Sequence, residues 1–188
     1  MKTMTRIFLM WLAANLMAAA DREADWKKVE EALKKDQPKT VIEMLAPLEK
    51  AALADEDWDE AGKAMALRAQ LQGRIEGSTA EAVRLLDAEI AKATDELQPI
   101  LRTLSAEWLF QHYRQNRWRY AQRTEAQGAG EDEIETWRLP RILSEIDARL
   151  QAALDKSEVL KSLPWATLRL SSPRAPWTTP SAPPYSTF

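Results

Sequence analysis

The side chains that could do chemistry gather in one stretch, from Tyr113 to Thr124, where arginine is interleaved with aromatic residues. Four arginines occur there, and no acid lies between Glu107 and Glu125. Guanidinium groups beside Trp and Tyr can stack on nucleic-acid bases or bind carboxylates. They can also join helices, by lying on aromatic rings and pairing the acids of a neighbouring helix. The candidate residues are Arg114, Arg117, Trp118, Arg119, Arg123 and Trp137.

Three interpretations of this stretch follow: packing between helices, docking of a protein partner, and binding of nucleic acid. The net charge of the chain helps to separate them. The total is −3, of which residues 1–20 contribute +2 and residues 161–188 contribute +3, which leaves −8 for residues 21–160. An acidic body argues against a nucleic-acid partner. The stretch is therefore interpreted as a structural network or as a protein-docking surface.

The residue types that most enzymes need are scarce. His112 is the single histidine and there is no cysteine, so a histidine pair, a Ser-His-Asp triad, a disulfide and a thiolate metal site are all excluded. The acids at Glu30-Glu31 and Glu131–Glu133 are expected at exposed helix ends, where they favour the helix dipole. No glycine-rich phosphate loop occurs. The sequence predicts a protein that is not an enzyme and has no cofactor or metal.

The first twenty residues have the pattern of a secretory signal peptide. Lys2 and Arg6 give a positive start, Ile7–Leu16 is a short apolar run, and Ala18–Ala20 supplies the small residues of a cleavage site. A membrane span needs roughly 20 apolar residues, and this run is shorter. The pattern predicts an exported protein, periplasmic or extracellular, with no stable membrane span after cleavage.

The elements that would position the arginine stretch are helices, because Ala, Leu, Glu, Arg and Lys dominate while Gly and β-branched residues are sparse. We predict an all-α fold. One stripe is expected to bury Ala64, Leu67, Leu71 and Ile75, and the last helix is expected to bury Ile142, Ile146, Leu150 and Ala153. The predicted helices span 21–35, 38 onward, 57–77, 78 onward, 95–124 and 136–154.

Boundary residues support these helices. Asp57 with Glu60, and Ser78 with Glu81, have the spacing of capping boxes, and Gly77 is expected to end the helix between them. Pro99 fits only in the first turn of the fifth helix. Pro47 lies inside the second helix and should kink it.

A weak internal repeat favours a particular architecture. Thr40–Leu45 and Glu81–Leu86 match in pattern at an offset of 41, and the helix between them is rich in small residues. This predicts stacked antiparallel helix hairpins of the tetratricopeptide kind over residues 21–160. Residues 161–188 hold six of the ten prolines and no acid, which is typical of a disordered tail.

Residues 21–160 resemble the N-terminal region of large bacterial alpha-2-macroglobulin-like proteins. The likeness rests on three stretches: Trp26–Val29 running into Lys35–Thr40, Tyr113–Thr124, and Asp132–Trp137 with the helix through Ile146. The resemblance implies a signal peptide and a helical segment ahead of macroglobulin-type β domains, in a protein that traps proteases. Its implied partners are the rest of such an ectodomain, or proteases met by a full-length parent.

The departures from this family limit what the resemblance implies. Without a cysteine there is no Cys-Gln thioester, and no bait region or β domain follows, so none of the family's functional residues is carried over. We expect a non-catalytic leader module, in a chain whose reading frame was lost near Pro164, where acids stop and prolines accumulate. The alternative is a free-standing periplasmic helical-repeat module that uses a groove near Arg117 and Arg119 to bind an acidic or peptide partner.

Overall fold

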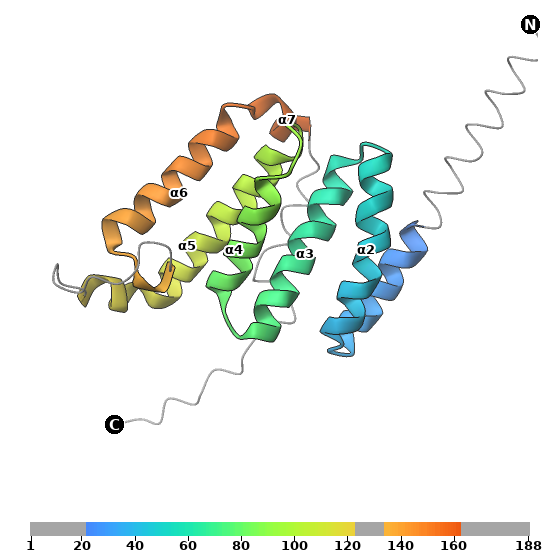
Figure 1. Ribbon diagram of the computed structural model, residues 1–188, viewed down its shortest axis with the longest axis horizontal. Helices are drawn as coiled ribbons and strands as arrows, with labels where there is room; N and C mark the ends of the chain where they lie inside the picture. Colours follow the sequence, from blue (N-terminus) through green and yellow to red (C-terminus); the bar gives the residue numbers. More distant parts are fainter. Residues whose placement is uncertain (1–21, 123–133, 163–188) are drawn as a thin grey trace, which may run out of the picture.

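The computed structural model describes residues 22–122 and 134–162, and within these ranges every regular element is a helix (Figure 1). This confirms the predicted all-α fold. The predicted signal peptide, residues 123–133 and the tail beyond residue 162 lie outside the described residues. The elements are a helix over residues 22–34, α2 (Pro38–Ala54), α3 (Trp58–Glu76), α4 (Thr79–Ile90), α5 (Gln98–Gln122), the 3-10 turn η1 (Ile134–Thr136), α6 (Leu139–Leu154) and α7 (Ser157–Ser162).

Each long helix packs on the next one along the chain. α2 lies on α3, α3 on α4, α4 on α5 and α5 on α6, and Figure 1 shows them side by side in this order. Packing between sequence neighbours is what stacked antiparallel hairpins produce. The finer likeness to tetratricopeptide repeats stays a prediction.

The turns between the first four helices have one common design. Asp36, Glu56 and Gly77 each adopt a left-handed backbone, with φ of 53°, 57° and 76°, and the next residue precedes a new helix. In each turn that next residue donates its amide to the carbonyl five residues earlier, which closes the preceding helix in a Schellman pattern. These bonds are Gln37 N to Ala32 O (3.1 Å), Asp57 N to Ala52 O (2.9 Å) and Ser78 N to Gly73 O (2.9 Å).

The sequence repeat follows from the spacing of these turns along the chain. The first and third turns, at Asp36 and Gly77, are separated by the same 41 residues as the matching sequence segments. Burial repeats with them, because the matching positions in α2 and α4 all face the core: Val41, Leu45, Ala82 and Leu86. The offset therefore reports one helix-pair unit of the structure.

Both predicted N-caps are confirmed. The side chains of Asp57 and Ser78 accept hydrogen bonds from the amides of Glu60 (3.1 Å) and Glu81 (3.3 Å). The reciprocal half of each capping box is not formed, because the two glutamates bind other side chains. Glu81 pairs with Arg84, and Glu60 faces the helix over residues 22–34.

α3 is buried on two sides. One side places Ala64, Leu67 and Leu71 against the apolar residues of α2 and the helix over residues 22–34. The other side places small residues, such as Ala66 and Ala69, in the larger core shared with α4, α5 and α6. The small residues noted in the sequence lie on both sides of α3, so α3 joins the two halves of the core.

Two residues predicted to be buried are exposed. Ile75 is 46% exposed because it lies in the last turn of α3, just before the chain reverses at Gly77. Leu150 is 40% exposed. The inner face of α6 runs through Ile146, Arg149 and Ala153, and one residue beyond Arg149 turns the side chain by about 100°.

Helix boundaries differ from the prediction at three places. α6 starts at Leu139 rather than residue 136, because Pro140 fits only in a first turn, and residues 134–136 form the separate 3-10 turn η1. α5 starts at Gln98 with Pro99 in its first turn, as predicted for that proline. α7 was not predicted. Pro47 lies inside α2, which continues to Ala54.

Glu56→Gly is expected to stabilise the fold. A left-handed backbone costs a non-glycine residue about 1–2 kcal/mol, and glycine avoids this cost. Part of the gain is lost because glycine raises the conformational entropy of the unfolded chain. We expect the free energy of unfolding in urea to rise by about 0.5–1 kcal/mol. The control is Ala54→Gly, at an exposed position in the right-handed last turn of the same helix, which should lower it. A fall in both variants would contradict the strain at Glu56.

Candidate interaction site

The second half of α5 carries the arginine stretch and turns part of it inward. His112 and Tyr120 are buried, and their rings meet edge to face with centroids 6.2 Å apart. The Tyr120 hydroxyl donates a hydrogen bond to the carbonyl of Ile134 at 3.1 Å, which joins α5 to η1. The single histidine is thus a buried residue that packs against the Tyr120 ring.

Four other side chains share the opposite face of α5, because residues three and four apart lie on the same side of a helix. Phe110 is 38% exposed and Trp118 is 61% exposed, and the two arginines between them are also exposed. We call this set the outer stripe; its members are Phe110, Arg114, Arg117 and Trp118. In the view of Figure 1, this end of α5 continues past α4.

The remaining predicted site residues do not join the outer stripe. Arg119 is exposed but lies about 140° around the helix from Arg114. Trp137 is only 8% exposed, and the guanidinium carbon of Arg141 lies 4.8 Å from its ring centroid. Arg123 lies outside the described residues. The fold therefore divides the six predicted residues.

The exposed arginines of α5 differ from the paired arginines elsewhere. Within residues 22–122 and 134–162, no ion pair involves Arg114, Arg117 or Arg119, whereas Arg68 and Arg149 each bind two acids. Among the described residues, the ring contacts of these three arginines lie inside α5: Arg114 with Phe110 at 5.9 Å and Arg119 with Trp118 at 6.0 Å. In the described part of the chain, the predicted inter-helix network is therefore not formed by these arginines.

Other charged residues join the helices. Arg68 of α3 binds Glu49 of α2 through Nε at 3.0 Å and lies 3.5 Å from Glu89 of α4. Burial acts against the charged form of this guanidinium, but the two glutamates hold its pKa above its ordinary value. One arginine thus connects three consecutive helices.

Asp87 has the same role further along the chain. Its Oδ1 accepts a hydrogen bond from the buried Ser105 hydroxyl of α5 at 2.7 Å, and its Oδ2 binds Arg149 of α6 at 2.6 Å. Arg149 also lies 3.3 Å from Glu145, one turn earlier on α6. This carboxylate therefore connects α4 to α5 and α6.

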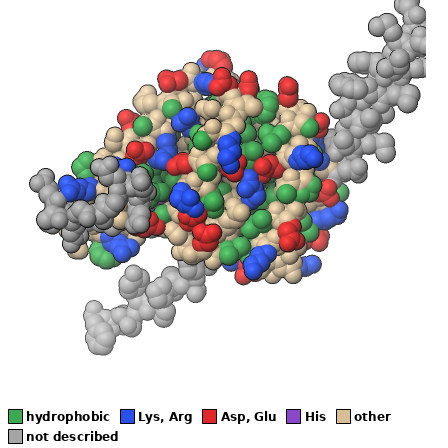
Figure 2. Space-filling model, viewed as in Figure 1, with side chains coloured by type: hydrophobic (Ala, Val, Ile, Leu, Met, Phe, Trp, Pro, Cys, Tyr) green, Lys and Arg blue, Asp and Glu red, His purple; other side chains and the backbone are tan. Residues whose placement is uncertain are grey.

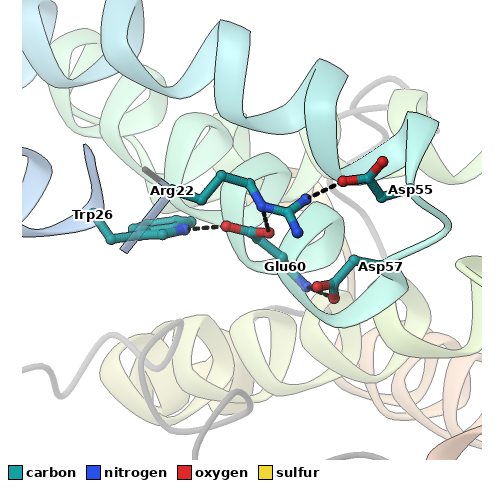
Figure 3. Close-up of polar contacts among 5 residues, drawn as sticks. All are labelled: Arg22, Trp26, Asp55, Asp57 and Glu60. Carbon is teal, nitrogen blue, oxygen red and sulfur yellow. Dashed lines mark hydrogen bonds and ion pairs between the residues drawn. The ribbon is translucent and has the colours of Figure 1, made fainter. Parts of the chain in front are cut away.

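The helix over residues 22–34 is held on α3 by a third cluster, shown in Figure 3. Glu60 accepts a hydrogen bond from the Trp26 indole nitrogen at 2.6 Å and lies 3.4 Å from Arg22. Arg22 also binds Asp55 at the end of α2 at 2.8 Å. Lys63 lies 3.6 Å above the Trp26 ring, and burial lowers its pKa despite the nearby acids.

These three connections could not be found by reading the sequence. Their partners are 18 to 62 residues apart in the chain, and no local spacing signals the pairs. The one local hint was Glu60, which has the spacing of a capping box but instead accepts a hydrogen bond from the Trp26 indole. Across the face drawn in Figure 2, acidic and basic side chains are interspersed.

A cleft of about 530 Å³ lies between α4, η1 and α6. Its walls include Glu81, Asp87, Glu145 and Arg149, and Trp137 lines it as well. In the described ranges there is no group of His, Asp and Glu side chains arranged to hold a metal ion. No helix of those ranges is long and apolar enough to cross a membrane.

Comparisons with protein-family models, with curated proteins and with solved structures give no match for this chain. What the geometry defines is a class: an all-helical body of sequentially packed helices, connected by shared charges, with a basic and aromatic stripe on its surface.

Trp26→Phe tests how the N-terminal helix is held. Phenylalanine keeps most of the ring contact with Lys63 but removes the N–H that binds Glu60. We expect the free energy of unfolding to fall by about 1 kcal/mol. Trp58→Phe is the matched control, because the Trp58 indole donates no hydrogen bond to a described residue, and it should cost less. Equal losses in both variants would mean that the indole hydrogen bond contributes nothing.

Proposed function

We propose that this chain is a non-catalytic helical module that acts as a scaffold and interaction surface. The observation that supports this is the use of its partly buried charges. Arg68, Asp87 and Glu60 each connect their own helix to one or two other helices. Ion pairs and charged hydrogen bonds between helices stabilise one arrangement of those helices. A docking module needs such a stable arrangement to present its binding surface.

The resemblance to the leader region of bacterial alpha-2-macroglobulin-type peptidase inhibitors gives this proposal a context. In that context the chain is exported, and its helical body adjoins macroglobulin-type domains of a larger parent. The support is the set of three matching stretches, which span nearly the whole described body.

The family context can be tested on the source DNA. Translation of the other two reading frames past the codon for Pro164 should reveal several hundred further residues of macroglobulin type. The expected continuation is rich in β-strand patterns and in acids. If neither frame continues in this way, the proposed parent does not exist at this locus and the family context fails.

A second candidate is a free-standing periplasmic helical-repeat protein that binds an acidic protein or peptide. The exposed arginines of α5, which pair with no acid among the described residues, favour it. Affinity capture with the purified chain separates the two candidates. A defined partner that is held by the chain and lost in Arg117→Ala/Arg119→Ala would favour the second.

A further inference from the structure

The outer stripe of α5 combines two apolar ends with a charged centre. Phe110 and Trp118 are eight residues apart, which separates them by about 12 Å along the helix axis. Both are large apolar side chains exposed to solvent. The stripe therefore offers two aromatic surfaces at a set separation, with two cations between them.

The charges between these aromatic side chains lack acidic partners in the described structure, although the guanidinium carbon of Arg114 lies 5.9 Å from the Phe110 ring centroid. Arg114 and Arg117 form no ion pair there, whereas Arg22, Arg68 and Arg149 bind acids at 2.6 to 3.5 Å. A guanidinium group presents a planar set of donors that matches a carboxylate. The complementary surface is thus acidic at its centre and apolar at its ends.

We propose that the outer stripe binds an acidic amphipathic segment of a protein partner. In this arrangement, apolar side chains of the segment cover Phe110 and Trp118, and its carboxylates bind Arg114 and Arg117. The inference deepens the second candidate function, on which it rests, by assigning the face and the chemistry of the partner. It also leaves Arg119 out of the carboxylate-binding pair, because Arg119 lies about 140° around the helix from Arg114 and its guanidinium carbon lies 6.0 Å from the Trp118 ring centroid.

A polypeptide partner fits this surface better than nucleic acid does. Two arginines on one helix face neutralise few phosphates, and residues 21–160 carry a net charge of −8 that repels a long polyanion. A short acidic segment meets less of this repulsion, and it adds apolar contacts that phosphates lack. Aromatic residues and arginine are also the types that contribute most at protein interfaces.

The test uses the full chain and three short fluorescein-labelled probes of equal length: a glutamate–tyrosine copolymer, polyglutamate and a single-stranded oligothymidylate. Fluorescence anisotropy at low ionic strength gives the apparent Kd. We expect the copolymer to bind more tightly than polyglutamate, because only the copolymer carries rings for Phe110 and Trp118. Arg114→Glu/Arg117→Glu should weaken copolymer binding about tenfold or more, and Trp118→Ala about fivefold.

The matched control is Lys34→Glu/Lys39→Glu, which makes the same charge change at two exposed lysines near the other end of the body. Its Kd should stay within about twofold of the parent chain, and an equal loss would mean general charge repulsion and overturn the inference. If Arg114→Glu/Arg117→Glu leaves copolymer binding unchanged, the outer stripe is not the binding surface, while the proposed function of binding an acidic partner is retained. No copolymer binding at all would refute both. Tighter binding of oligothymidylate, lost in the same variant, would assign the stripe to nucleic acid instead.

Discussion

Trp108→Ala is expected to lower the free energy of unfolding by about 4 kcal/mol, which is a large part of the stability of a domain of this size. Trp108 is only 1% exposed and lies in the larger core cluster, where α5 meets its neighbours. Truncation removes an indole from close-packed surroundings and leaves a cavity that the helices fill only partly. Urea unfolding followed by circular dichroism measures the change.

Trp118→Ala is the control, because it removes the same side chain from the same helix ten residues later. Trp118 is mostly exposed, so its replacement should change the unfolding free energy by no more than about 0.5 kcal/mol. If the two variants lost equal stability, the assignment of Trp108 to the core would be wrong. Together the pair separates folding from binding, since only Trp118→Ala is expected to affect a partner without affecting the fold.

Gly73→Ala is expected to destabilise the protein by about 2 kcal/mol, although alanine favours a helix over glycine by about 1 kcal/mol. A Cβ atom on Gly73 would lie 2.6 Å from the Ala82 Cβ, 2.7 Å from the Ala82 nitrogen and 2.8 Å from the Ser78 carbonyl oxygen. Two of these atoms belong to the backbone, so no side-chain rotation relieves the contact. α3 and α4 would have to move apart, and the melting temperature measures the cost.

Two further variants isolate the cause. Gly77→Ala adds the same methyl group in open space, so its cost of about 1 kcal/mol comes only from the left-handed backbone, which has φ of 76°. Ala82→Gly in the Gly73→Ala background removes one of the three close contacts and should restore only part of the stability. Full stability in Gly73→Ala alone would show that the two helices do not approach so closely.

The two largest effects concern two different contacts of the same helices. Gly73 governs how closely α3 approaches α4, and Trp108 fills the core that these helices share with α5. Because each helix packs mainly on its sequence neighbours, damage at one contact should loosen that contact before distant ones. Hydrogen exchange of Gly73→Ala should therefore show the larger loss of protection in α3 and α4.

The sequence by itself determined the helices, most of their buried faces and several of their ends. These features depend on residues within a few positions of one another: the 3.6-residue period of apolar side chains, the caps at Asp57 and Ser78, and Gly77 with its left-handed backbone. It also contained the 41-residue offset, which the turns reproduce. It did not reveal that Asp36 and Glu56 adopt the same backbone, because those residue types do not signal it.

Only the tertiary structure decided which charged residues are paired and which are exposed. Arg68 and Arg149 resemble Arg114 and Arg117 in type, but other helices of the packed body bring acids to them. Likewise, the exposure of Leu150 depends on where α5 lies beside α6. A helix has an inner and an outer face only in relation to its neighbours, and local sequence contains no record of how those neighbours are placed.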